Sequence, residues 1–149
     1  MPRLVVNPFI VALWALFEST VTEVASLIQK KKGVALGLAD IKGKHFRSRI
    51  EKYYIHVLEF SFDISDKTSQ VDLLGAIRNA IVHSNGRVEG LSKTNTELIN
   101  GDKVEGVSES SYGGYLIIDL RYAKKSFELV EEYLRLLFDN YGALRKKRE

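Results

Sequence analysis

The sequence predicts an all-α protein, mainly an up-and-down bundle of four or five helices with a loop or a small β-hairpin inserted before the last helix. Two observations lead to this prediction. Four long segments carry apolar residues at the three- and four-residue spacing of a helix face. Residues 87–118, between the third and fourth of these segments, are instead rich in Gly, Ser, Asn and Thr. Because the 149 residues show no internal repeat and no sharp hinge, we expect one domain over residues 1–149.

The first helix is expected over residues 8–31, with Asn7 as its N-cap and Pro8 at its first helical position. The apolar run over residues 4–17 raises the question of a signal peptide or a membrane anchor. That run is interrupted by Asn7-Pro8 and ends short of the ~20 residues that a spanning helix needs. We therefore expect a core helix in a cytoplasmic protein that has no membrane partner.

Three further helices are expected over residues 44–62, from about residue 66 to residue 84, and over residues 120–141. The third of the four should end near Asn85-Gly86, where a left-handed terminal residue is favourable, and Asp119 is a suitable N-cap for the last. Their apolar stripes are, in chain order, Phe46, Ile50, Tyr54 and Val57; Val71, Leu74, Ile77 and Ile81; and Phe127, Val130, Leu134, Leu137 and Tyr141.

The insertion keeps a few short apolar pieces within its polar stretch. Residues 104–107 and 115–118 could pair as a small hairpin, with a turn at Gly113-Gly114. An irregular loop is the alternative interpretation, and the sequence leaves both open.

Charge and composition restrict the function without naming it. The chain has 22 Lys+Arg against 19 Asp+Glu, a formal net charge of +3, which is compatible with a nucleic-acid partner but does not require one. Lysines 30–32 suit the end of a helix, and a nucleic-acid contact is the alternative. In the basic C-terminal tail, Lys146 and Lys147 could attract phosphate, or the tail could be merely solvated.

Several kinds of site are excluded or unexpected. The absence of Cys excludes disulfides, Cys-ligated zinc, iron–sulfur clusters and thiol nucleophiles. No Walker loop, dinucleotide-binding fingerprint or metal-ligand spacing is present. We therefore expect neither a metal nor another cofactor.

The candidate catalytic residues lie at the end of the third helix. They are Arg78, Asn79 and His83, which interrupt an apolar segment. Asn79 and His83 are one turn apart on the same face, and Arg78 lies at the edge of the apolar stripe. An imidazole can exchange a proton near neutral pH, a guanidinium binds phosphate, and an amide orients an oxygen without adding charge. Together these groups suit attack of an RNA 2′-hydroxyl on the neighbouring phosphodiester without a metal.

The alternative is that His83 is a capping or surface histidine, since positive charge stabilises a helix C-terminus. The bare Arg-to-His spacing is weak evidence, because Arg49 and His56 on the second helix show a similar one. One helix alone would not aim Arg78 and His83 at the same atom. Another helix or a second copy of the chain would have to complete such a site.

The pattern of Arg78-Asn79 followed by Val82-His83, on a helix between two longer ones, closely resembles the signature of the HEPN superfamily of small helical domains. That signature is an Arg and a His separated by four to six residues, with a polar residue commonly after the Arg. The resemblance covers the helical layout of residues 8–141, but the sequence motif itself is confined to residues 73–86. The insertion over residues 87–118 is where such families diverge.

The resemblance implies a metal-independent endoribonuclease that acts as a toxin or an antiviral-defence effector. Carried over by position, Arg78 would hold the scissile phosphate, Asn79 would orient the pair, and His83 would be the general base or acid. Ser84 and Asn85, at the helix exit, would contact the RNA substrate. Active members usually dimerise around one composite cleft, and the wide apolar face of the last helix fits a homodimer.

Members without activity also exist, so a second hypothesis stays open. The chain could be a non-catalytic module that binds nucleic acid or protein, such as the partner in a toxin–antitoxin pair or an adaptor. A cognate antitoxin or a defence-system partner is compatible with either hypothesis.

Overall fold

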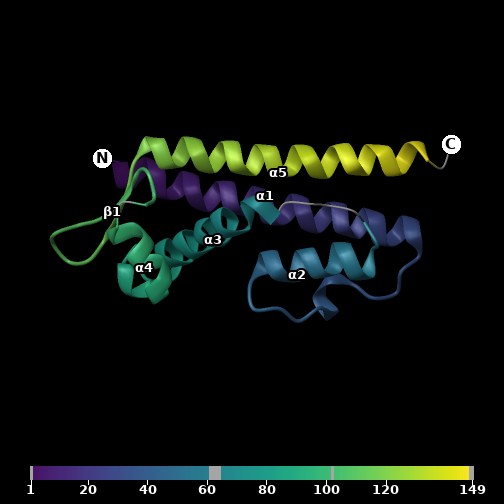
Figure 1. Ribbon diagram of the computed structural model, residues 1–149, viewed down its shortest axis with the longest axis horizontal. Coiled ribbons are helices and arrows are strands. Elements are labelled where there is room, and N and C mark those ends of the chain that lie inside the picture. The colour runs from purple at the N-terminus through teal and green to yellow at the C-terminus, as the bar shows by residue number, and fades with distance from the viewer. Residues whose placement is uncertain (1, 61–64, 102, 148–149) are drawn as a thin grey trace. The chain divides into compact units, whose positions relative to one another are not determined.

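The computed structural model describes residues 2–60, 65–101 and 103–147, and Figure 1 shows the order of its elements. In this part of the chain the fold is mainly helical, with a small antiparallel sheet before the last helix, as the sequence predicts. The helices are α1 (Pro2–Lys32), α2 (Phe46–Lys52), α3 (Thr68–His83), α4 (Lys93–Asn100) and α5 (Leu120–Lys146), and the strands are β1 (Val107–Glu109) and β2 (Leu116–Ile118).

The chain forms two compact units. The motif unit consists of Met1–Ala15 and Ser69–Leu129, and therefore contains nearly all of α3, the whole insertion and the first part of α5. The second unit consists of Leu16–Thr68 and Val130–Glu149. The candidate residues on α3 and its exit turn all belong to the motif unit.

Helix α1 begins at Pro2, six residues before the predicted start, and Pro8 lies inside it. The prediction that Asn7 caps the helix and Pro8 opens it is therefore wrong. Pro8 lacks only the one N–H that would bond to the carbonyl four residues earlier, so its effect on the first turn is local. Tertiary contacts of that turn favour the longer helix: Val6 is 2% exposed, and the Arg3 guanidinium donates to the Asn85 carbonyl at 3.1 Å.

By length and composition, α1 could cross a membrane between Arg3 and Lys32. Core helices of soluble proteins and signal sequences meet the same criterion, so this finding is weak evidence for a membrane span. Along its length α1 buries one apolar side chain per turn or so, including Ile10, Phe17 and Ile28.

In the motif unit, α3 packs closely through its predicted apolar stripe. Val71, Leu74 and Ile77 are at most 2% exposed. A Cβ at Gly75 would lie only 2.8 Å from the Trp14 ring, so the glycine permits a close approach of α3 to α1. This packing fixes the face on which the polar residues of α3 lie.

The insertion contains a hairpin, one of the two alternatives that the sequence leaves open, and also a helix that we did not predict. The first strand of the hairpin, β1, begins only at Val107, the last of the expected residues 104–107. Strands β1 and β2 pair antiparallel, with Val107 opposite Ile118 and Glu109 opposite Leu116. Helix α4 begins after Ser92, whose hydroxyl accepts the N–H of Asn95 at 3.2 Å. That N-cap serine, followed by the apolar Leu98-Ile99, was the available signal for α4.

In the second unit, the second helical segment is shorter than the predicted residues 44–62. Helix α2 is followed by a π-helical turn, Tyr53–Val57, and the chain turns at Glu59, which has a φ of 48°. Phe60 is 5% exposed and packs its ring 5.6 Å from that of Tyr54. The burial of Phe60 after a widened turn accounts for the early end of the helix, and Phe62 lies outside the described residues.

In the second unit, Lys32 of the lysine cluster has a structural explanation, and α5 is longer than predicted. The Lys32 ammonium donates to the carbonyls of Leu58 and Glu59, so it satisfies backbone groups at the end of the second helical segment. Helix α5 continues to Lys146, five residues beyond the predicted end, and the ring of its Tyr133 packs edge-on against Phe17 at 4.9 Å. Lys32 therefore has a structural role in this unit.

Candidate functional site

Arg78 and Asn79 form a hydrogen-bonded pair on α3. The Arg78 guanidinium donates from Nη1 to the Asn79 side-chain oxygen at 2.9 Å. Arg78 is half-buried and Asn79 is exposed, while the flanking Ile77 and Ala80 are fully buried and hold the helix face in place. The amide thereby holds the planar guanidinium in one orientation. Asn79 thus contacts Arg78 directly, as an orienting residue would.

His83 is the last residue of α3, and its side chain is exposed. Within the described residues, its imidazole makes no hydrogen bond or ion pair, either with the Arg78–Asn79 pair or with any other group. The structure therefore joins two of the three predicted catalytic residues and leaves the third one turn away at the surface. Its ring nitrogens are free to meet a ligand or a second protein surface.

The turn after His83 is built to end the helix at this position. Asn85 and Gly86 have φ values of 52° and 77°, both in the left-handed region, and the Gly86 N–H donates to the Ala80 carbonyl at 2.8 Å. This arrangement is a helix C-cap, and it confirms the predicted end of the third helix. Strand β2 holds the turn from outside, because the Leu116 N–H donates to the Gly86 carbonyl at 2.8 Å.

The two residues predicted to contact substrate at the helix exit are placed differently. Ser84 is half-buried, and its hydroxyl lies so close to Gly90 that a Cβ there would approach it to 2.5 Å. The side chain of Asn85 is exposed, while its backbone carbonyl accepts from Arg3. Asn85 is therefore accessible to a ligand, whereas the hydroxyl of Ser84 packs against the following turn.

Three residues that we did not predict to be functional lie at the same exit turn. The guanidinium carbon of Arg3 is 4.6 Å from the centroid of the Tyr115 ring, and that of Arg87 is 5.2 Å away. Arg87 also donates to the Tyr115 hydroxyl at 3.3 Å. Arg87 directly follows Gly86, the last residue of the motif, which was a usable signal. Nothing local in the sequence indicates that Arg3 or Tyr115 would join it.

Lys146 and Lys147, the predicted phosphate contacts of the tail, are exposed and belong to the second unit. Lys146 is the last residue of α5. Neither makes an ion pair within the described residues. Both stay candidates for attracting an anion, and the structure gives them no partner that would explain them otherwise.

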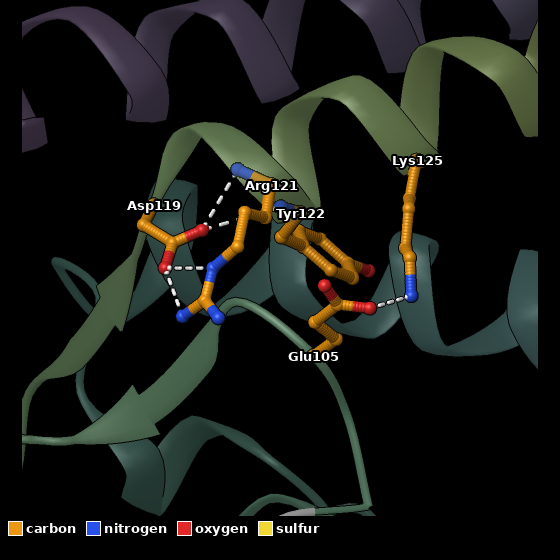
Figure 2. A network of polar contacts seen from close by, with 5 residues as sticks. All are labelled: Glu105, Asp119, Arg121, Tyr122 and Lys125. Carbon is orange, nitrogen blue, oxygen red and sulfur yellow. Dashed lines mark hydrogen bonds and ion pairs between the residues drawn. The ribbon is translucent and has the colours of Figure 1, made fainter.

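A second polar cluster in the motif unit fastens the insertion to the start of α5 (Figure 2). The Asp119 carboxylate accepts the backbone N–H of Arg121 at 2.8 Å and its guanidinium at 2.7 Å, which confirms Asp119 as the N-cap. Lys125 forms an ion pair with Glu105. Arg121 holds the pKa of the Asp119 carboxyl below its usual range, Lys125 does the same for the pKa of Glu105, and burial raises the pKa of the Tyr122 hydroxyl.

A shallow pocket of about 290 Å³ lies beside this cluster, lined in part by Glu105, Gly106, Asp119 and Arg121. Its charged groups already satisfy each other. The cluster therefore has a structural explanation that the end of α3 lacks.

The motif unit also carries an apolar groove between the first turns of α1 and α5. Its volume is about 530 Å³, and Val5, Val6, Phe9, Leu120, Ala123, Lys124 and Phe127 line it. Leu120 is 72% exposed and Phe127 is 49% exposed. Large apolar side chains gathered in this way on a surface are typical of an interaction site.

Within the described residues, no group of three or more His, Asp or Glu side chains is placed to hold a metal ion. Neither a scan of the chain against protein-family models nor searches of curated proteins and of solved structures find a significant match.

Proposed function

We propose that this chain is a metal-independent endoribonuclease of the HEPN type, acting in the cytoplasm as a toxin or a defence effector. The observation that carries the proposal is the Arg78–Asn79 pair, fixed one helical turn before an exposed His83 at the end of α3. The guanidinium would bind the scissile phosphate and stabilise the charge that develops on it. The imidazole would transfer a proton.

The reaction needs two proton transfers. The 2′-oxygen of the RNA forms a bond to phosphorus while the bond from phosphorus to the 5′-oxygen breaks, which gives a 2′,3′-cyclic phosphate and a free 5′-hydroxyl. A base must take the proton of the 2′-hydroxyl, and an acid must give one to the departing 5′-oxygen. A single His83 cannot hold both roles at the same moment, whereas His83 from two copies of the chain can supply both.

This requirement favours a homodimer with one composite cleft. The apolar groove between α1 and α5 supports it, because a second copy would bury Phe127 and its neighbours. We expect Phe127→Asp to convert the dimer into a monomer in sedimentation experiments and to abolish most RNA cleavage. Ile55→Asp is the matched control, because Ile55 is 47% exposed but lies in the second unit and does not line the groove. A monomeric wild-type protein that cleaves RNA would contradict the composite cleft.

The central test is cleavage of RNA by the purified protein in EDTA. We expect His83→Ala to slow cleavage by about 10²- to 10⁴-fold, which is the usual contribution of a general acid–base group. His56→Ala is the control, since His56 is also exposed but lies in the second unit. Products ending in a 2′,3′-cyclic phosphate would support the mechanism. Equal cleavage by the wild type and His83→Ala would exclude His83 as the catalytic group.

The second candidate function is a non-catalytic module that binds nucleic acid, or a cognate antitoxin or defence-system protein. Lys146 and Lys147 favour it, because within the described residues no carboxylate pairs with their positive charge. Salt-sensitive RNA binding that Lys146→Gln and Lys147→Gln weaken, without any cleavage by the wild type, would favour this module over the nuclease.

A further inference from the structure

Three separate segments of the motif unit meet at the turn that follows His83. The first turn of α1 contributes Arg3, the exit turn of α3 contributes Asn85 and Arg87, and the residue just before β2 is Tyr115. Arg87 and Tyr115 are also paired through their backbones in an isolated β-bridge. The cluster is therefore built by the fold and does not depend on the conformation of one loop alone.

The two guanidinium groups are held in place without being neutralised. Arg3 donates to a backbone carbonyl and lies over the Tyr115 ring, and among the described residues no carboxylate pairs with it. Arg87 lies 3.8 Å from Glu89, whose side chain is 74% exposed, so the attraction between them is weak. Stacking on an aromatic ring restricts a guanidinium while leaving its charge available.

The cluster adjoins the candidate catalytic histidine. Only Ser84 separates His83 from Asn85, whose carbonyl Arg3 binds, and Arg87 is four residues after His83. If one phosphate of a nucleic-acid strand were bound at Arg78 and His83, the neighbouring phosphates of that strand would lie close to this turn. Arg3 pairs with no described carboxylate, and the ion pair of Arg87 with Glu89 is long and exposed, so both guanidinium groups are suited to bind such a neighbouring phosphate.

We propose that Arg3 and Arg87, arranged on Tyr115, form a second phosphate-binding site that holds the RNA backbone next to the cleaved position. The inference rests on the proposed RNA substrate and adds substrate-positioning residues to it. Contacts of this kind supply affinity and register without sequence preference. The Arg121 guanidinium in the same unit offers no equivalent site, because Asp119 already binds it through two hydrogen bonds.

The test measures binding of a short fluorescein-labelled single-stranded RNA by anisotropy, in the His83→Ala background so that cleavage does not interfere. Arg3→Gln and Arg87→Gln should each weaken binding about three- to tenfold and lower the slope of log affinity against log salt by about one. Arg121→Gln is the matched control, with the same change of charge in the same unit, and should leave the slope unchanged.

A purely structural role of the cluster predicts a different result. Arg3→Lys and Arg87→Lys keep the charge and lose the planar stacking group, so for phosphate binding they should retain the salt slope even where the thermal unfolding midpoint falls. If the Gln variants lose thermal stability while their salt slope equals that of the His83→Ala parent, the inference is overturned. It is also overturned if the His83→Ala protein binds no RNA.

Parallel cleavage assays with His83 present separate this inference from the proposed function. If the wild-type protein binds RNA without cleaving it and the Gln variants lose salt slope, the phosphate site stands and the nuclease does not. If the wild type cleaves RNA and the Gln variants bind and cleave as it does, the nuclease stands and the second phosphate site does not.

Discussion

The motif unit contains two polar clusters of opposite character. At the start of α5, Asp119 is matched by Arg121 and Glu105 by Lys125, and each carboxyl pKa is lowered by its cation (Figure 2). At the end of α3, His83 has no partner within the described residues and Arg3 has no carboxylate. In the first cluster each charge is matched by an opposite charge, whereas in the second, within the described residues, His83 has no partner and the only carboxylate near Arg3 or Arg87 is the exposed Glu89.

This difference indicates which cluster serves the fold and which is available to a ligand. Exposed, paired charges contribute little individually to stability, but they fix the position of a segment when several of them act together. Arg3 and Arg87 also hold segments together, through the Asn85 carbonyl and the Tyr115 ring, but these contacts leave most of their positive charge unneutralised. The end of α3 is therefore the better candidate for binding, although the cluster at α5 adjoins a pocket.

The largest expected effect on stability follows from a change at Gly106, beside the paired cluster. Gly106 has a φ of 79°, and a Cβ there would lie 2.5 Å from the backbone nitrogen of Tyr122. Gly106→Ala should therefore lower the free energy of unfolding by about 1–3 kcal/mol, measured by urea titration. Its RNA affinity, measured where the variant is folded, should equal that of the wild type.

Gly142→Ala is the control for that prediction. Gly142 lies in α5, and a Cβ at this position would meet nothing within 4 Å, so alanine should stabilise the helix by about 0.5–1 kcal/mol. If Gly106→Ala left stability unchanged but weakened RNA binding, the assignment of structural and binding roles to the two clusters would have to be reversed.

A smaller effect is expected from acid at the paired cluster. Because the folded pKa of Asp119 and of Glu105 lies below the unfolded value, both carboxylates contribute stability above the unfolded pKa of about 4. That contribution is lost as the pH falls through the folded pKa. The urea midpoint should therefore fall between about pH 5 and pH 3, and it should fall less in Glu105→Gln.

Glu97→Gln provides the comparison for the acid experiment, because Glu97 is exposed on α4 and lies 3.9 Å from Lys93. Its acid profile should match that of the wild type. An acid profile of Glu105→Gln that is as steep as the wild type's would show that the Glu105–Lys125 pair does not stabilise the folded protein.

The parts of the fold that follow from local chemistry were predictable from the sequence. Asn85-Gly86 ends α3 and Asp119 caps α5, whereas the hairpin was one of two alternatives and its first strand begins only at Val107. The start of α1 was not predictable in this way, because Asn7-Pro8 is a strong local start signal. Contacts of the first turn with residues about 80 positions away outweigh it.

The candidate site likewise has one part that could be predicted from the sequence and one part that could not. Arg78 and Asn79 are adjacent in the sequence, so their pairing on one helix could be expected. The association of Arg3, Arg87 and Tyr115 depends on three segments whose meeting only the tertiary structure reveals. The R-x4-H spacing identified the helix end, and it contained no information about the cations beside it.

The backbone conformation at Asn85-Gly86 affects how readily Asn85 deamidates during storage of the protein. An asparagine followed by glycine is prone to deamidate, because the unhindered glycine nitrogen attacks the side-chain carbonyl and expels ammonia to form a cyclic imide, which water then opens to a carboxylate. In this structure the Gly86 nitrogen instead holds its hydrogen bond to Ala80 at 2.8 Å, within the helix cap. Deamidation should therefore require the end of α3 to fray. Its product would place a new carboxylate at residue 85, next to the guanidinium of Arg3.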